Sequence, residues 1–132
     1  MTTNPPSSSQ DASFATYRAI HTTLGHYIEG ARTGSARQMR LAFLETARIQ
    51  GSYTGKPADW TLDEFCALIE KSGPATEVEA SVVTVELAGT AAMARLEARN
   101  WRGTRYTDFF VLLQRGGEWR IASKVFFAHD RA

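Results

Sequence analysis

The sequence has one cysteine, a nearly balanced charge and no long apolar run. These features argue against a disulfide-bonded protein, a nucleic-acid-binding protein and a membrane-spanning protein. Its single cysteine, Cys66, cannot form an internal disulfide, which permits a reducing compartment. The 15 basic and 14 acidic residues are interspersed and leave a net charge of +1, so we expect no contact with nucleic acid or with an anionic membrane. No apolar run approaches the ~18 residues that a membrane-spanning helix needs.

The first residues, MTTNPPSSSQDAS, lack the basic residues and the apolar core of a signal peptide. We therefore expect a cytoplasmic protein. Residues 1–11 have little to bury and are expected to form a disordered tail. Residues 12–129 are expected to form a single domain, because 132 residues is the size of one ordinary domain.

Motifs for metals and common cofactors are also missing. His21, His26 and His129 are scattered and lack the paired spacing of a zinc site. The chain contains no nucleophile elbow, no phosphate-binding loop and no dinucleotide-binding glycine motif. We expect neither a metal nor a cofactor.

The first half of the chain does contain helical patterns. Apolar residues recur at helical spacing before Gly34, and Ser35 and Thr61 are suitable N-cap residues. The expected helices run from Asp11 or Ser13 to Ala31, through ARQMRLAF, and from Leu62 to Lys71. Between the last two, RIQGSYTGKPADW is expected to break into short extended pieces and turns.

After Pro74 the period of the pattern changes from 3.6 to 2, which is typical of strands. Turn signals AGT, RGT and RGGE separate four segments. The expected strands are Glu77 to Ala88, Ala91 to Trp101, Arg105 to Gln114 and Trp119 to Ala128. Helices followed by an antiparallel meander predict an α+β domain in which helices cover one face of a curved sheet.

The faces of this sheet can be predicted by treating each turn as a two-residue hairpin. The face toward the helices is then apolar, with small residues in the middle strand. Its members include Ala94, Ala98, Thr107, Phe109, Ala122, Lys124 and Phe126. In this register Asp108 and Lys124 point to opposite faces, unless a β-bulge intervenes.

The second face is too apolar in its last two strands for open water, whereas an exposed sheet face is normally polar. We expect a homodimer that covers this face, with its charged residues forming an ion-pair lattice. The expected interface residues are Arg95, Glu97, Asp108, Phe110, Leu112, Ile121, Val125 and Phe127.

Several segments resemble a known group, namely YIEGARTGS, TLDEF and YTDFFVLLQRGGEWRIASKVFF. From about Ala12 to Phe127 the chain resembles the NTF2-like superfamily, and most closely its branch of putative lumazine-binding proteins, near the SnoaL-like proteins. The most specific match is Thr107-Asp108-Phe109 followed by Gly117-x-Trp119-x-Ile121-x-x-Lys124-x-Phe126. The resemblance implies a cone with an apolar pocket, in which three N-terminal helices pack on the concave face of a curved, mostly antiparallel sheet. It also implies frequent dimerisation through the outer face.

The resemblance leaves the chemistry open, because the same fold hosts isomerases, cyclases, dehydratases and proteins with no known chemistry. Relatives commonly carry a His-x-Asp-like segment just after the second helix, where this chain reads Phe43-Leu44-Glu45-Thr46-Ala47. The missing histidine argues against a metal or acid–base role there, although Glu45 could still reach a pocket.

Lys124 is the leading candidate for a functional residue. Inside a cone, its amine would lose solvation and would either lower its pKa or pair with an acid. The alternative is a lysine whose stem packs on aromatic rings while its ammonium reaches the rim. Further candidates for lining the pocket, each with the alternative of an ordinary core or surface role, are Tyr17, His21, Tyr27, Trp60, Thr107, Phe109 and Phe126.

Three functions remain open at this point. The preferred one is binding of a small apolar or aromatic ligand, with Lys124 favouring an anionic or carbonyl group. The second is a dimerising or partner-binding module whose core is filled. The third is a cofactor-independent isomerase, cyclase or dehydratase, which would need His21, Tyr27 or Glu45 to move protons. A cavity of several hundred Å³ that contains Lys124 and a second polar group would favour binding.

Overall fold

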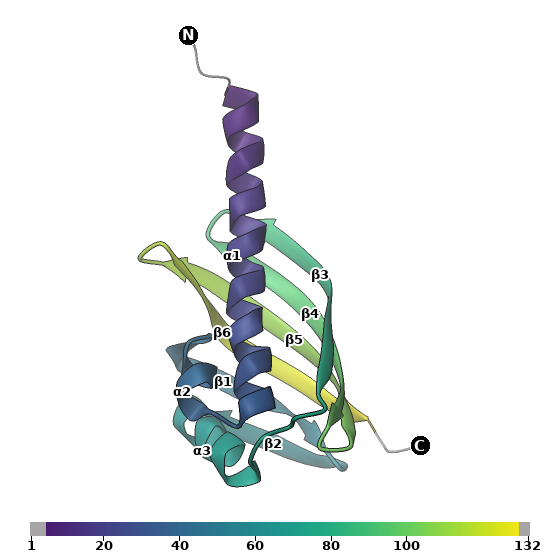
Figure 1. Cartoon of the computed structure of the whole chain (residues 1–132). Helices are drawn as coiled ribbons and strands as arrows, with labels where there is room; N and C mark the ends of the chain where they lie inside the picture. The colour runs from purple at the N-terminus through teal and green to yellow at the C-terminus, as the bar shows by residue number, and fades with distance from the viewer. Residues whose placement is uncertain (1–4, 130–132) are drawn as a thin grey trace.

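The apolar stripe of the N-terminal segment produces one long helix, α1 (Pro5–Thr33), in the computed structural model, which describes residues 5–129. Ile20, Leu24 and Tyr27 are fully buried, so this stripe packs on the sheet. The concave side of one curved sheet wraps around α1, and the two shorter helices lie beside its C-terminal end (Figure 1).

Helix α1 begins earlier than expected. Residues 5–11, assigned above to the tail, belong to the helix, and its first turns project beyond the sheet in Figure 1. Residues 1–4 of the expected tail lie outside the described residues. No helix within residues 5–129 is both long and apolar enough to cross a membrane.

The two shorter helices begin at the predicted caps. The Ser35 hydroxyl accepts a hydrogen bond from the Gln38 amide at the start of α2 (Ala36–Arg40). This helix ends three residues before its predicted end, because the chain turns and enters a strand at Phe43. A capping box between Thr61 and Glu64 starts α3, as predicted.

Six strands form one mixed sheet in the order β2-β1-β6-β5-β4-β3. All neighbours are antiparallel except β1 and β6, which are parallel. The strands and α3 are β1 (Phe43–Tyr53), β2 (Lys56–Thr61), α3 (Leu62–Ser72), β3 (Glu79–Ala88), β4 (Ala91–Trp101), β5 (Thr104–Arg115) and β6 (Glu118–His129). The four C-terminal strands confirm the predicted meander. The prediction that RIQGSYTGKPADW forms only short extended pieces and turns is wrong, because this segment belongs to the hairpin β1–β2. The prediction of three N-terminal helices is also wrong, because α3 follows these two strands.

A first register shift lies between β4 and β5. The pairing passes from Trp101 opposite Thr104 to Ala98 opposite Tyr106, so β4 contains one residue more than β5 in this stretch. Asn100 lies there with a φ of 58°, a left-handed conformation that asparagine tolerates. Because side chains alternate along a strand, this β-bulge turns the rest of β5 to the face opposite to the predicted one.

A second register shift lies between β5 and β6. The pairing passes from Leu112 opposite Ile121 to Val111 opposite Ser123, which leaves Ala122 as the extra residue of β6. The side chain of Ile121, before the bulge, therefore points to the inner face. After the bulge, Lys124 and Phe126 point to the same face. Both shifts are local changes that a sheet built from ideal hairpins does not include.

The predicted faces are therefore wrong for a group of residues on β5 and β6. Asp108, Phe110, Leu112 and Ile121, expected in the outer interface, are at most 1% exposed and lie on the inner face. Thr107 and Phe109, expected in the pocket, lie on the outer face instead. The predicted positions of Arg95, Glu97, Val125 and Phe127 on the outer face, and of Lys124 and Phe126 on the inner face, are confirmed.

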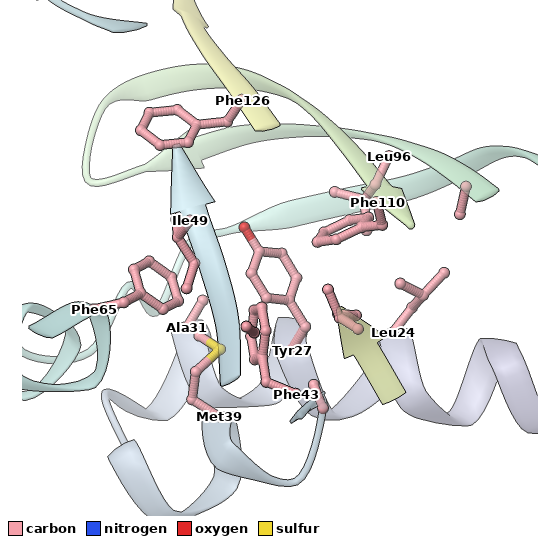
Figure 2. Close-up of a cluster of buried hydrophobic side chains, with 14 of the residues drawn as sticks. Leu24, Tyr27, Ala31, Met39, Phe43, Ile49, Phe65, Leu96, Phe110 and Phe126 are labelled. Carbon is pink, nitrogen blue, oxygen red and sulfur yellow. The ribbon is translucent and has the colours of Figure 1, made fainter. Parts of the chain in front are cut away.

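Tyr27 lies at the centre of the core (Figure 2). Its ring makes edge contacts with Phe43, Trp101 and Phe110, at centroid distances of 6.1, 5.6 and 5.1 Å. Its hydroxyl points away from α1 toward the sheet in Figure 2. These edge contacts fix the Tyr27 ring in an apolar environment, and they thereby fix the position of its hydroxyl group.

The parallel pairing of β1 and β6 places Gly51 directly against Phe126. A Cβ atom at Gly51 would lie 2.2 Å from the Phe126 carbonyl oxygen and 2.6 Å from a carbon of its ring. Only glycine leaves room for this ring, which stacks on Trp60 with centroids 5.8 Å apart and planes 14° apart.

We expect Gly51→Ala to lower the free energy of unfolding by about 1–3 kcal/mol, because the added methyl group overlaps the backbone and ring of Phe126. Gly25→Ala is the matched control, since a Cβ there meets nothing within 4 Å and alanine is favoured by about 0.5–1 kcal/mol inside a helix. Urea unfolding followed by circular dichroism measures both. Equal midpoints for the two variants would show that the close approach at Gly51 is unimportant.

Candidate functional site

Lys124 lies on the inner face of β6 and is only 3% exposed. Its Nζ atom lies 4.6–5.4 Å from the centroids of four aromatic rings, those of Tyr27, Phe65, Trp101 and Phe126. Four elements contribute these rings: α1, α3, β4 and β6. The amine is thus enclosed by ring faces that favour a cation. We call these four rings the aromatic cage.

Asp108 is the acidic partner of this lysine. Its Oδ1 lies 4.0 Å from Lys124 Nζ, and its Oδ2 accepts a hydrogen bond of 2.7 Å from the Tyr27 hydroxyl. Asp108 is fully buried, and among the side chains of residues 13–129 its Oδ1 is the single buried polar atom without a hydrogen bond. The register shifts are the reason that the acid and the lysine, expected on opposite faces, share the inner one.

Burial moves all three groups toward their uncharged forms. Desolvation lowers the pKa of the Lys124 amine, against the opposing effect of Asp108. Desolvation raises the pKa of the Asp108 carboxyl, although the charge of Lys124 and the Tyr27 hydrogen bond act in the other direction. The pKa of the Tyr27 phenol is raised well above its ordinary value by burial and by the neighbouring Asp108.

A pocket of about 600 Å³ leads from the surface to Lys124. Its lining includes the exposed residues Tyr53 and Leu68 at the surface and the buried residues Thr104 and Lys124. The complete lining is Ala31, Tyr53, Trp60, Phe65, Leu68, Ile69, Ser72, Gly73, Trp101, Arg102, Thr104, Tyr106, Lys124 and Phe126. Six of these fourteen residues are aromatic, and the buried Lys124 is among the others.

The structure brings together only part of the predicted pocket. Trp60, Lys124 and Phe126 line it, and Tyr27 lies behind the lysine. The others do not line it: Tyr17 and His21 are exposed on α1, Thr107 and Phe109 are on the outer face, and Glu45 is exposed on β1. For Tyr17 and His21 the reason is that α1 buries the stripe through Ile20 and Leu24.

Sequence reasoning missed several rings of the pocket. Trp101 stands at the β4–β5 turn, Phe65 lies on α3, and Tyr53 stacks on Tyr106 with centroids 6.4 Å apart. Trp101 could have been suspected, because a large aromatic residue directly before a hairpin turn is close to the end of the cone. The contribution of α3 depends on its docking against the hairpin β1–β2, for which the sequence has no local signal.

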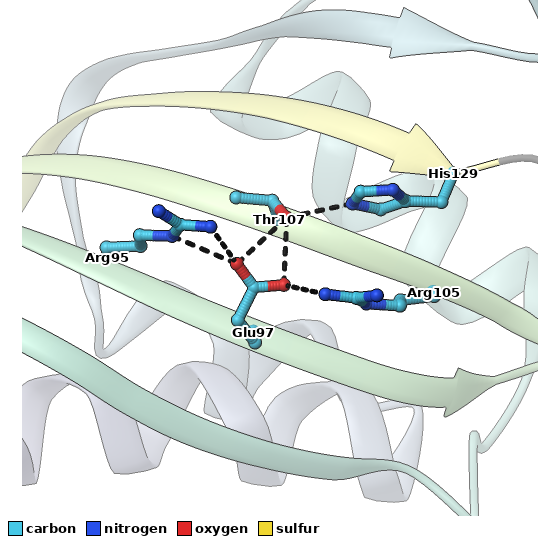
Figure 3. Close-up of polar contacts among 5 residues, drawn as sticks. All are labelled: Arg95, Glu97, Arg105, Thr107 and His129. Atoms are coloured by element: carbon cyan, nitrogen blue, oxygen red, sulfur yellow. Dashed lines mark hydrogen bonds and ion pairs between the residues drawn. The ribbon is translucent and has the colours of Figure 1, made fainter.

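The outer face carries a separate polar network around Glu97 (Figure 3). Arg95 and Arg105 donate to its carboxylate at 2.8 and 3.1 Å, and the Thr107 hydroxyl lies 2.8 Å from one of its oxygens and 2.9 Å from His129 Nε2. These contacts hold the pKa of Glu97 below its usual value despite partial burial. Among the side chains of residues 13–129, no group of three histidine, cysteine, aspartate or glutamate residues is arranged to hold a metal ion.

Comparison with known proteins places these features in a family. The family model "Putative lumazine-binding" matches residues 15–127. An NTF2-like protein of unknown function from Shewanella baltica OS155 is 32% identical, with a TM-score of 0.83 over 89% of this chain and 96% of that chain. A second one, from Methylobacillus flagellatus KT, is also 32% identical, with a TM-score of 0.84 over 88% of this chain and 94% of that chain. The aldolase FrzH of Cladobotryum sp is 25% identical over 116 residues, which cover 87% of this chain and 93% of the aldolase.

We expect Lys124→Met to lower the free energy of unfolding near pH 7.5 by about 3–5 kcal/mol, because it leaves a buried carboxylate without its cation. The loss should be smaller at pH 5. The folded protein holds Asp108 at a raised pKa, whereas the unfolded chain releases this proton near pH 3.9. The stability that this group contributes is therefore fully present below about pH 3.9 and is lost as the pH rises through the folded pKa.

The control is the double variant Lys124→Met with Asp108→Asn, in which the titrating carboxyl is absent. Urea midpoints measured from pH 4.5 to 8 should diverge between the single and double variants as the pH rises. Parallel curves would mean that Asp108 does not titrate in the folded protein over this range.

Proposed function

The chain belongs to the lumazine-binding family of NTF2-like proteins, and from this membership and the shape of its pocket we propose that it binds a small aromatic or apolar compound bearing a carbonyl or anionic group. The observation that carries the proposal is the pocket itself, which is lined by six aromatic residues and by the buried Lys124. Lys124 serves as the polar contact at its inner end.

The size and lining of the pocket support ligand binding over a filled core. About 600 Å³ falls within the range of roughly 300–1,000 Å³ that is typical of small-molecule sites. The combination of apolar and aromatic residues with a few polar ones, here Ser72, Arg102, Thr104 and Lys124, is also typical of such sites. A module with no ligand would gain stability by filling this space with side chains.

The arrangement of rings favours a flat ligand. Trp60 stacks on both Phe65 and Phe126, with planes 24° and 14° apart, so three rings of the pocket lining are nearly parallel. A planar ring system can stack with these rings, while an oxygen at its far end accepts a hydrogen bond from Lys124.

A second candidate function is aldol chemistry, favoured by the similarity to the aldolase FrzH. Aldol reactions form or break a carbon–carbon bond next to a carbonyl group and need groups that move protons. The Asp108 carboxyl and the Tyr27 hydroxyl, hydrogen-bonded at 2.7 Å beside the amine, are suitable groups for this purpose.

We also propose that the protein forms a homodimer through its outer sheet face. Five apolar side chains on this face are between 42% and 50% exposed, which is unusual for a sheet face in water. They are Met93, Phe109, Val111, Val125 and Phe127. The neighbouring charges around Glu97 would fix the orientation of the two copies.

A thermal-shift screen with aromatic aldehydes, aromatic acids, pterins and flavins tests the binding proposal. We expect at least one class to raise the melting temperature, because a ligand that binds only the folded state stabilises it by mass action. Leu68→Arg should abolish this shift, since Leu68 is at the mouth of the pocket. The matched control is Leu41→Arg, a second exposed leucine outside the pocket. An equal shift in both variants would place the ligand elsewhere.

Light scattering tests the dimer. We expect a dimer at micromolar concentration that buries on the order of 800 Å² on each copy. Val125→Asp should yield a folded monomer, because the new charge would be unpaired in the interface. The Leu68→Arg variant, altered on the helix side, should remain dimeric. A monomeric wild-type protein would contradict the proposal.

A further inference from the structure

We propose that Lys124 acts as a nucleophile that forms an imine with an aldehyde or ketone held in the pocket, and that Asp108 supplies the proton that releases water. This inference rests on the proposed binding function, because the carbonyl compound must first occupy the pocket. It adds a covalent reaction that binding alone does not require.

The first support is the environment of the amine. A structural lysine usually places its ammonium at the rim and gathers hydrogen bonds, since it has three donors. Lys124 instead has its Nζ enclosed by the aromatic cage, and among the side chains described, residues 13–129, its nearest acidic oxygen is Asp108 Oδ1 at 4.0 Å, beyond hydrogen-bond distance. Lys124 is also one of the residues that line the pocket.

The second support is the position of the unpartnered Asp108 oxygen. The Tyr27 hydrogen bond occupies Oδ2 and orients the carboxyl group, while Oδ1 lies buried on the side of the lysine. A separation of 4.0 Å is too long for a direct hydrogen bond. It does allow an oxygen on the carbon bonded to Nζ to lie within about 2.6–3.2 Å of Oδ1, the reach of a proton donor.

The reaction balances with these groups alone. The lone pair of the neutral amine forms a C–N bond, the carbonyl π electrons move to oxygen, and a proton passes from nitrogen to that oxygen to give a carbinolamine. The protonated Asp108 carboxyl then donates its proton to the hydroxyl group, the C–O bond breaks, and water leaves. The nitrogen lone pair forms the C=N bond, so the neutral amine and acid end as an iminium cation and a carboxylate.

The aromatic cage also suits the product. An iminium carries a positive charge at the nitrogen that the four ring faces surround at 4.6–5.4 Å. The Asp108 carboxylate formed in the same step balances that charge. Burial lowers the pKa of Lys124 and raises the pKa of Asp108, which increases the fraction of molecules that hold the neutral amine and the protonated acid.

Reductive trapping tests the inference on the wild-type protein. We would incubate it with 2-naphthaldehyde and sodium cyanoborohydride at pH 7.5 and locate the added naphthylmethyl group by peptide mass spectrometry. The chain contains three lysines, and Lys56 and Lys71 are exposed internal controls. We expect Lys124 to be labelled at least about 10-fold faster than either, because an amine of lowered pKa is neutral in a larger fraction of molecules. Equal or slower labelling of Lys124 would overturn the inference.

Asp108→Asn tests the role of the acid. With folding verified by circular dichroism, labelling of Lys124 should slow by on the order of 10²-fold, as expected for loss of a general acid, while Lys56 and Lys71 are unaffected. An unchanged rate at Lys124 would overturn the role of Asp108 as proton donor.

A non-reactive analogue separates this inference from the binding proposal. 2-Naphthalenemethanol has the same ring but cannot form an imine, and its binding is read by thermal shift of wild type against Leu68→Arg. If the alcohol binds in the pocket and the aldehyde does not label Lys124, the imine inference fails and binding stands. If the alcohol does not bind in the pocket and the aldehyde does not label Lys124, the binding proposal and the imine proposal both fail for aromatic carbonyl compounds.

Discussion

Burying an amine and a carboxyl group in an apolar interior costs several kcal/mol for each charge unless the two groups compensate each other. Lys124 and Asp108 compensate each other because they lie 4.0 Å apart. The Tyr27 hydrogen bond further stabilises the carboxyl group, and the ring faces around the amine stabilise its positive charge. Each of these partners comes from a different part of the chain, so α1, β5 and β6 must be assembled before either charge is tolerable. The positions of the helix and of the two strands relative to each other are therefore linked through this one pair.

The β-bulges make the pairing possible. Without the extra residue near Asn100, Asp108 would point to the outer face, and without Ala122 the inward alternation of β6 could not include both Ile121 and Lys124. The bulges also bend the strands, which helps the sheet curve around α1 (Figure 1). The same local insertions thus shape the cone and orient its polar groups.

The sequence was a good guide wherever the signal is local. The caps at Ser35 and Thr61 and the four C-terminal strands were predictable, because capping residues and alternation act within a few positions. The inward position of Lys124 was also predictable. The face of Asp108 was not, since one inserted residue reverses a whole strand, and neither was the contribution of Phe65, which depends on how a helix docks onto a distant hairpin.

The strand order has a consequence for synthesis on the ribosome. β6 follows the other strands in the chain and yet lies in the middle of the sheet, with the hairpin β1–β2 on one side and the meander β3–β5 on the other. During translation these two parts emerge first and have no common hydrogen-bonding partner until β6 leaves the exit tunnel. The nascent chain therefore carries an exposed strand edge on β1 from the time that strand emerges, and a second one on β5 from the time the meander emerges, until β6 pairs with both. These are the edges on which chaperones would act.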